Sequence, residues 1–421
     1  MNGRMLRSPA GLLAVLLLTL GCTGRGRFSY NKDELPSAPP WPDQQVTNYP
    51  FTDVLVYNGL ATAFGNAQGQ TPSVQPAGAK PLSVLVLSGG AKFTAFNAGA
   101  LVGWTASGQR PKFDIATGVS AGALAASLAF LGPKYDCRLT ELYTTLSRED
   151  LFRFRPIMNL IRYRTITTPE PLEGVIAKEV TETYLADLRE AHTEGRRLFV
   201  ATNLVKAQRL VIWDLGAIAC SGRQDAGQLI RKVLLAATCI NGWTTPVSFD
   251  VDVNGCRYVE EHGDGGIHTE AFLQTTNGLT AGSNVFVLTA GKLFPDPLAD
   301  KPGFLTLFYS NISCALSALY RADLLRIYTL CVTSRSNFLL MSLPQNTPGK
   351  ASSMVFEPEE MQKLYRIGYQ MSANGIAWRT APPGVPPNEQ PPVRIGTPGL
   401  PLMGETPKHS FHLRHQQPLK E

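Results

Sequence analysis

Several motifs that would place a chain in a common functional class are missing from these 421 residues. There is no Cys-x-x-Cys pair, which argues against a structural zinc site or a redox motif. Neither Gly-x-Gly-x-x-Gly nor Gly-Lys-Ser/Thr occurs, so a nucleotide-binding loop is not expected, and no feature calls for a cofactor. The net charge of +6 comes from scattered basic residues without a Lys/Arg block, which excludes nucleic acid as an expected partner.

The apolar run near the N-terminus, Gly11 to Leu20, is too short to span a bilayer and follows two arginines, as in an export signal. The run ends before Cys22 in a pattern that resembles a bacterial lipobox, although Thr19 stands where that motif prefers leucine. We expect residues 1–22 to be a signal peptide and Cys22 to be lipidated. The protein would then be an exported, membrane-anchored lipoprotein, with secretion after ordinary cleavage as the alternative.

The other six cysteines are even in number, which in an exported protein is compatible with disulfides. Buried free thiols are equally compatible with the sequence, which does not pair them. They are Cys137, Cys220, Cys239, Cys256, Cys314 and Cys331.

Composition divides the remaining chain into three parts. Residues 23–80 are rich in proline, glycine and small polar residues and read as a tether. Residues 81–380 contain the apolar segments that are typical of buried strands and helices, so we expect them to form the main domain. Residues 381–421 are rich in proline and are predicted to be a disordered tail.

The main domain begins with an alternation of strands and helices. Residues 82–87 and 113–117 are predicted strands, and residues 91–106 and 121–131 are the helices that follow them. This order predicts an α/β fold with a parallel sheet. Further helices are expected within 139–190, 224–237, 301–335 and 357–378, further strands at 198–202, 209–214 and 284–290, and a hairpin at 251–259.

The junction between the second strand and its helix has the sequence Gly118-Val119-Ser120-Ala121-Gly122. A serine between glycines at a strand-to-helix turn is typical of a nucleophile elbow, which presents the hydroxyl at the tip of a strained bend. The helix N-terminus beneath it offers free N–H groups to a developing negative charge. Ser120 is therefore the candidate nucleophile.

A second turn of small residues, Ser88-Gly89-Gly90-Ala91, follows the first strand. Its backbone N–H groups could hold an anion, because glycines permit close approach and a helix begins there. The carboxyl ends of parallel strands meet at one edge of a sheet, so this turn and Ser120 should lie together. An oxyanion hole fits this arrangement better than a nucleotide site.

The candidate base is Asp264, in Gly263-Asp264-Gly265-Gly266. His262 and His268 are too close to Asp264 in sequence for the separate-loop geometry of a Ser-His-Asp triad, so a Ser-Asp dyad is the economical interpretation. The alternatives are a hairpin Asp-Gly turn and a metal site with Glu260 and Glu261, for which no second ligand cluster exists. We expect no metal.

These three motifs, in this order over residues 82–340, resemble the patatin-like phospholipase family of serine acyl hydrolases. The resemblance implies a three-layer α/β/α fold with a mainly parallel sheet, Ser120 as nucleophile and Asp264 as base, with Gly265 and Gly266 completing the base motif. It also implies an acyl-enzyme, a lipid or acyl-ester substrate, and an oxyanion hole in the Gly89–Ala91 loop with Ala121 assisting.

The sequence departs from the family pattern in its oxyanion loop, where Ala91 replaces the third glycine and Thr94 replaces the last. Two alternatives therefore stay open: a non-catalytic envelope lipoprotein that uses the fold as a binding surface, and an acyltransferase or thioesterase on the same site. Lys92, next to the loop, would either attract a lipid phosphate or be a solvated first-turn lysine. The oligomeric state is not indicated.

Overall fold

The computed structural model describes residues 80–156, 165–253, 256–275, 278–298, 301–348 and 356–389. The predicted signal peptide, Cys22 and nearly all of the predicted tether lie outside these ranges, as does the tail from residue 390 on. Residues 381–389, the start of the predicted tail, include the turn η6 (Pro387–Glu389), and Glu389 forms an ion pair with Arg379 at 2.6 Å.

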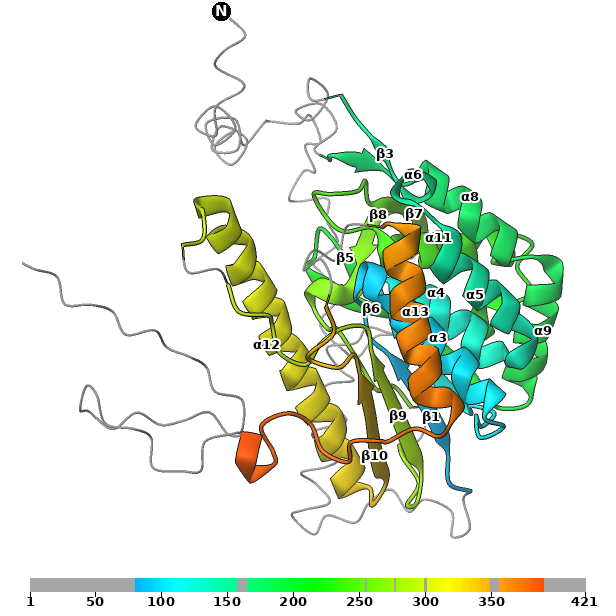
Figure 1. The fold of residues 1–421 in the computed structure, drawn as a ribbon. Coiled ribbons are helices and arrows are strands. Elements are labelled where there is room, and N and C mark those ends of the chain that lie inside the picture. Colours follow the sequence, from blue (N-terminus) through cyan, green and yellow to red (C-terminus); the bar gives the residue numbers. More distant parts are fainter. Residues whose placement is uncertain are drawn as a thin grey trace, which may run out of the picture.

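A mixed eight-stranded sheet forms the centre of the molecule (Figure 1). Its order is β10-β9-β1-β2-β5-β8-β7, with β6 also on β5. The pairs from β10 through β5 are parallel, whereas β6, β8 and β7 are added antiparallel. The strands are β1 (Ser83–Leu87), β2 (Ile115–Val119), β5 (Arg197–Leu204), β6 (Arg209–Asp214), β7 (Val247–Val253), β8 (Cys256–Asp264), β9 (Asn284–Thr289) and β10 (Asn337–Ser342), and a separate pair is β3 (Arg153–Phe154) with β4 (Thr167–Thr168).

Helices cover both faces of the sheet (Figure 1). Most of them lie on one face, and α12 crosses the other. The helices are α3 (Thr94–Ala106), α4 (Ala121–Leu131), α5 (Asp136–Thr145), α6 (Arg148–Leu151), α8 (Glu170–Glu179), α9 (Glu182–Thr193), α10 (Leu215–Ala219), α11 (Ala226–Thr238), α12 (Phe304–Thr333) and α13 (Pro358–Ala373).

The central strand β1 shows how the two layers of core arise. Its side chains alternate between faces, as in any strand. Leu85 and Leu87 join the core beneath the larger helical layer, and Val84 and Val86 join the core beneath α12. All four are fully buried. The predicted α/β/α architecture with a mainly parallel sheet is confirmed.

The elements closest to the predicted site match the sequence well. The helix expected at 121–131 has those bounds, and the helix expected at 91–106 is a short turn, η2 (Ala91–Phe93), followed by α3. The strand expected at 113–117 runs instead over 115–119, so the sheet continues to the residue before Ser120. The carboxylate of Asp114 accepts a hydrogen bond from the backbone N–H of Ser83 at 2.7 Å, which explains the later start.

Candidate active site

Ser120 lies at a sharp bend between the end of β2 and the start of α4. Its φ of 53° and ψ of −136° form a conformation that costs a non-glycine residue of order 1–3 kcal/mol. The flanking glycines permit this bend: a methyl group on Gly118 would lie 2.6 Å from the carbonyl oxygen of Gly122. One on Gly122 would lie 2.3 Å from the carbonyl oxygen of Ser88. This close approach fixes the elbow against the loop that follows β1.

The Ser120 hydroxyl donates a hydrogen bond to Asp264 Oδ2 at 2.6 Å. Asp264 ends β8, and its other carboxylate oxygen accepts a hydrogen bond from the backbone N–H of Gly266 at 2.8 Å. Its own N–H donates to the carbonyl oxygen of Cys239 at 2.7 Å. Both carboxylate oxygens of Asp264 therefore accept hydrogen bonds, one from the Ser120 hydroxyl and one from the Gly266 N–H.

Burial raises the pKa of Asp264 from 3.8 to about 6, and the hydrogen bonds from Ser120 and Gly266 oppose this rise. The residue is 8% exposed. A carboxyl group with this pKa is mostly ionised at pH 7, and it is a stronger base than an ordinary aspartate. The pair can therefore transfer the serine proton to the carboxylate as the serine oxygen attacks an electrophile.

The glycine-containing loop after β1 lies beside Ser120. Gly90 and Ala91 have positive φ angles of 147° and 49°. Gly89 belongs to the loop, but its N–H donates to the carbonyl oxygen of Glu270 at 3.1 Å and is not free to bind an oxyanion. Among the residues that the structure describes, the N–H groups of Gly90, Ala91 and Ala121 have no acceptor. These three are the available donors.

The alanine that replaces the third family glycine sits in a left-handed backbone conformation. An L-residue there costs roughly 1–2 kcal/mol, so the loop is strained at Ala91 but keeps its N–H group. Thr94, the other departure from the glycine pattern, is the first residue of α3 and is fully buried. Thr94 is therefore accommodated inside the fold, whereas Ala91 is half-buried and lies in the loop beside Ser120.

The two histidines that flank the Asp-Gly-Gly motif contact other groups. His262 is fully buried, with Nδ1 3.0 Å from the Thr202 hydroxyl and Nε2 3.2 Å from the Glu260 carboxylate. Nε2 of His268 lies 2.9 Å from Oδ1 of Asn203. Over the described ranges, no group of three or more His, Cys, Asp or Glu side chains is arranged to hold a metal ion. The geometry at Ser120 is that of a serine with a carboxylate.

Lys92 corrects one expectation from the sequence, because it is buried rather than solvated. Its Nζ lies 3.7 Å from Glu360 Oε2 on α13 and 5.2 Å from the centre of the Phe93 ring. The side chain is 0% exposed, so it does not reach a substrate phosphate. Its role is to tie the loop after β1 to α13 through a charge pair.

A further carboxyl group, which the sequence motifs did not single out, stands beside the nucleophile. A methyl group on Gly89 would lie 2.7 Å from Glu270 Oε2 and 3.1 Å from Ser120 Cβ. Burial, together with the nearby carboxylates of Asp264 and Asp323, raises the pKa of Glu270 to about 8. In the sequence, Glu270 is a single acidic residue between the base motif and an apolar segment, and it belongs to no motif.

The described cysteine side chains are free thiols, of which Cys239 and Cys331 are buried as that alternative expected, whereas Cys137, Cys220 and Cys314 are exposed. The side chain of Cys256 lies outside the described set. The free cysteines are Cys137, Cys220, Cys239, Cys314 and Cys331.

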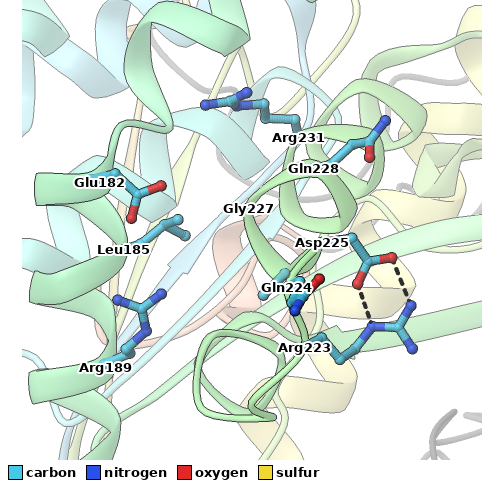
Figure 2. Close-up of a pocket in the computed structure, with 10 residues that line it drawn as sticks. Glu182, Leu185, Arg189, Arg223, Gln224, Asp225, Gly227, Gln228 and Arg231 are labelled. Carbon is cyan, nitrogen blue, oxygen red and sulfur yellow. Dashed lines mark hydrogen bonds and ion pairs between the residues drawn. The ribbon is translucent and has the colours of Figure 1, made fainter.

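A separate cavity of about 570 Å³ opens between α9 and α11 (Figure 2). Three arginines line it, but all already have partners: Arg189 and Arg231 donate to backbone carbonyls, and Arg223 pairs with Asp225 at 2.7 Å. The Ser-Asp pair does not line this cavity. It therefore adds nothing to the candidate active site.

Comparison with known proteins finds a match to one family model. A family model described as patatin-like phospholipase matches residues 85–273, the range that contains the loop, Ser120 and Asp264. Two solved structures resemble the chain at low identity. VipD from Legionella pneumophila is 12% identical over 71% of this chain and 68% of its own, with a TM-score of 0.32. The type III effector protein ExoU is 14% identical over 70% and 52%, with a TM-score of 0.26. No curated protein matches.

Proposed function

We propose that this protein is a serine acyl hydrolase of phospholipids or related lipids, because residues 85–273 match the patatin-like phospholipase family model. The observation that carries the proposal is the 2.6 Å hydrogen bond from Ser120 to Asp264 at a strained elbow. A serine is a weak nucleophile until a nearby base accepts its proton, and this geometry supplies that base.

In the proposed acylation step, Ser120 Oγ attacks the ester carbonyl carbon while its proton passes to Asp264. The negative charge that develops on the carbonyl oxygen is stabilised by the free N–H groups of Gly90, Ala91 and Ala121. The bond to the leaving alcohol then breaks, and Asp264 returns the proton to that alcohol. The product is an acyl ester of Ser120.

Deacylation repeats these roles with water. Asp264 accepts a proton from the water as its oxygen attacks the acyl carbon, and the same N–H groups stabilise the second oxyanion. The bond to Ser120 Oγ breaks, and the proton passes from Asp264 to Ser120. The free fatty acid leaves and the resting pair is restored.

The first half of α12 supports a lipid surface as the location of the substrate. No charged residue occurs from 302 to 320, while Lys301 and Arg321 flank this stretch. In Figure 1 this part of α12 extends away from the neighbouring elements. Its exposed apolar side chains, with their exposed fractions, are Phe304 (65%), Leu307 (45%), Phe308 (49%), Tyr309 (66%), Ile312 (45%) and Leu316 (37%).

The second half of α12 packs on the sheet, with Leu324, Ile327 and Cys331 in the core. The second half of α12 is thus packed in the core, while its first half exposes apolar side chains, an arrangement that suits contact with a membrane interface. Among the described residues, no helix has the length and apolar character needed to cross a bilayer. We propose contact with the lipid surface here, in addition to the proposed lipid anchor at Cys22 on an exported protein.

Release of fatty acid from phospholipid vesicles tests the proposed activity. Ser120→Ala should lower the rate at least about 10³-fold, because the nucleophile is lost. Ser127→Ala is the matched control: this serine lies in the adjoining helix α4, where its hydroxyl donates to the carbonyl oxygen of Leu124 at 2.9 Å. Equal rates for wild type and Ser120→Ala, or no release by folded wild type, would contradict the proposal.

Vesicle sedimentation tests the proposed contact through α12. Phe308→Ser should weaken binding about tenfold while hydrolysis of a soluble ester is unchanged, since burying a phenylalanine side chain is worth roughly 1.5–3 kcal/mol. Val332→Ser, at the opposite end of α12 and 57% exposed in the wild type, is the control. Equal loss in both variants would argue against a localised lipid contact.

A further inference from the structure

Glu270 places a second carboxyl group at the nucleophile. Its Oε2 approaches Gly89 on the side where Ser120 Cβ also lies, and its Oε1 would be 3.6 Å from a methyl group on Gly266. The carboxyl group therefore stands between the oxyanion loop and the base motif. In the part of the chain that the structure describes, it has no hydrogen-bond partner.

The backbone N–H and carbonyl groups of Glu270 are both fixed by hydrogen bonds. The N–H of Glu270 donates to Asp323 Oδ2 at 2.8 Å, and its carbonyl oxygen accepts the Gly89 N–H at 3.1 Å. The Thr269 hydroxyl donates to the same Asp323 oxygen at 3.0 Å. This fixed segment positions the Glu270 side chain at the site, as is required of a group that contacts a substrate.

The surroundings of Glu270 are acidic. Asp264 faces it from β8, and Asp323 and Tyr320 face it from α12; Asp323 is paired with Arg326 at 2.7 Å. Burial is the main cause that raises the pKa of Glu270 to about 8, against about 6 for Asp264. At pH 7 the Asp264 carboxyl group is then mainly ionised and accepts hydrogen bonds, whereas the Glu270 carboxyl group is mainly neutral and can donate one. Such a division between two carboxyl groups suits acid–base chemistry.

We propose that the Glu270 side chain lines the ester-binding site and donates a hydrogen bond from its carboxyl O–H to an oxygen of the bound acyl ester. This inference rests on the proposed hydrolase function. The proton stays on Glu270 throughout, and no bond to Glu270 forms or breaks. The donor supplements the N–H groups of a loop in which Ala91 has replaced a glycine.

The test is the pH dependence of kcat/KM for a neutral, soluble short-chain ester in wild type, Glu270→Gln and Glu270→Ala. Wild type should lose activity above about pH 8, where the donor ionises. Glu270→Gln, which keeps a neutral donor of similar shape, should stay within about threefold of wild type at pH 7 and lose the alkaline decline. Glu270→Ala should fall about tenfold to hundredfold.

Glu261→Gln, an exposed position on β8, is the control and should match wild type at every pH. Thermal unfolding of each variant checks that it is folded. A Glu270→Ala enzyme with the rate and pH profile of wild type would overturn the role of Glu270 while Ser120-dependent hydrolysis stands. So would Glu270→Gln falling as far as Glu270→Ala, which would indicate an ionised carboxylate. A wild type without Ser120-dependent hydrolysis would overturn both proposals.

Discussion

Asp323 in α12 accepts a hydrogen bond from the backbone N–H of Glu270 at 2.8 Å. The carbonyl oxygen of Glu270 in turn accepts the N–H of Gly89, in the loop beside Ser120. The helix that exposes apolar side chains is therefore joined, through two hydrogen bonds, to the loop proposed to hold the oxyanion. The helix that we propose to contact lipid and the loop that we propose to hold the oxyanion are thus linked through the backbone of Glu270.

The activity should have an acid limb with its midpoint near pH 6. Asp264 accepts a proton only when ionised, and burial raises its pKa to about 6. Below that pH, kcat/KM should fall about tenfold per pH unit, measured with a soluble ester so that vesicle charge does not contribute. An acid limb near pH 4, or none, would contradict Asp264 as the base.

Replacing the base should stabilise the fold at neutral pH. Burial raises the pKa of Asp264 in the folded state from its ordinary value of 3.8 to about 6, so stability falls as pH rises from about 4 to 6. Asp264→Asn removes that ionisation and should raise the free energy of unfolding by about 1–3 kcal/mol at pH 7. Urea unfolding at pH 7 and pH 4 checks this, and the gain should shrink at pH 4. A variant less stable than wild type at pH 7 would count against the burial argument.

The elbow should not tolerate a side chain at Gly122. Gly122→Ala would place a methyl group 2.3 Å from the carbonyl oxygen of Ser88, so Ser120 must move away from the oxyanion loop. We expect a loss of at least about 2 kcal/mol in stability and of about 10²-fold in activity. Gly174→Ala, within α8 and with nothing within 4 Å of the added methyl, should instead gain up to about 1 kcal/mol. Similar melting temperatures for both variants would refute the packing account.

Restoring the family glycine at Ala91 should relieve strain. The φ of 49° costs alanine more than glycine, so Ala91→Gly should stabilise the protein by about 1 kcal/mol without loss of activity. Ala186→Gly, at an exposed position within α9, should destabilise by a similar amount. Denaturant midpoints for the two variants should therefore move in opposite directions, and shifts of the same sign would contradict this account.

Local sequence patterns were enough to locate the elbow, the loop and the order of strands and helices around them. Gly118 and Gly122 carry that signal because the backbone at those points admits no side chain. The expectation for Lys92 was wrong because its partner, Glu360, comes from a helix far along the chain. Glu270 escaped notice for the same reason: its pKa depends on burial and on Asp323 in α12, and sequence spacing reports neither.

The most direct test of the central claim is labelling with a fluorophosphonate, followed by intact-mass measurement and mapping of the modified residue. The hydrogen bond between Ser120 and Asp264 predicts one adduct per wild-type chain, located on Ser120. It also predicts no adduct in Ser120→Ala and labelling at least tenfold slower in Asp264→Asn. An adduct on another residue, or labelling of wild type and Asp264→Asn at the same rate, would contradict the proposed Ser-Asp pair.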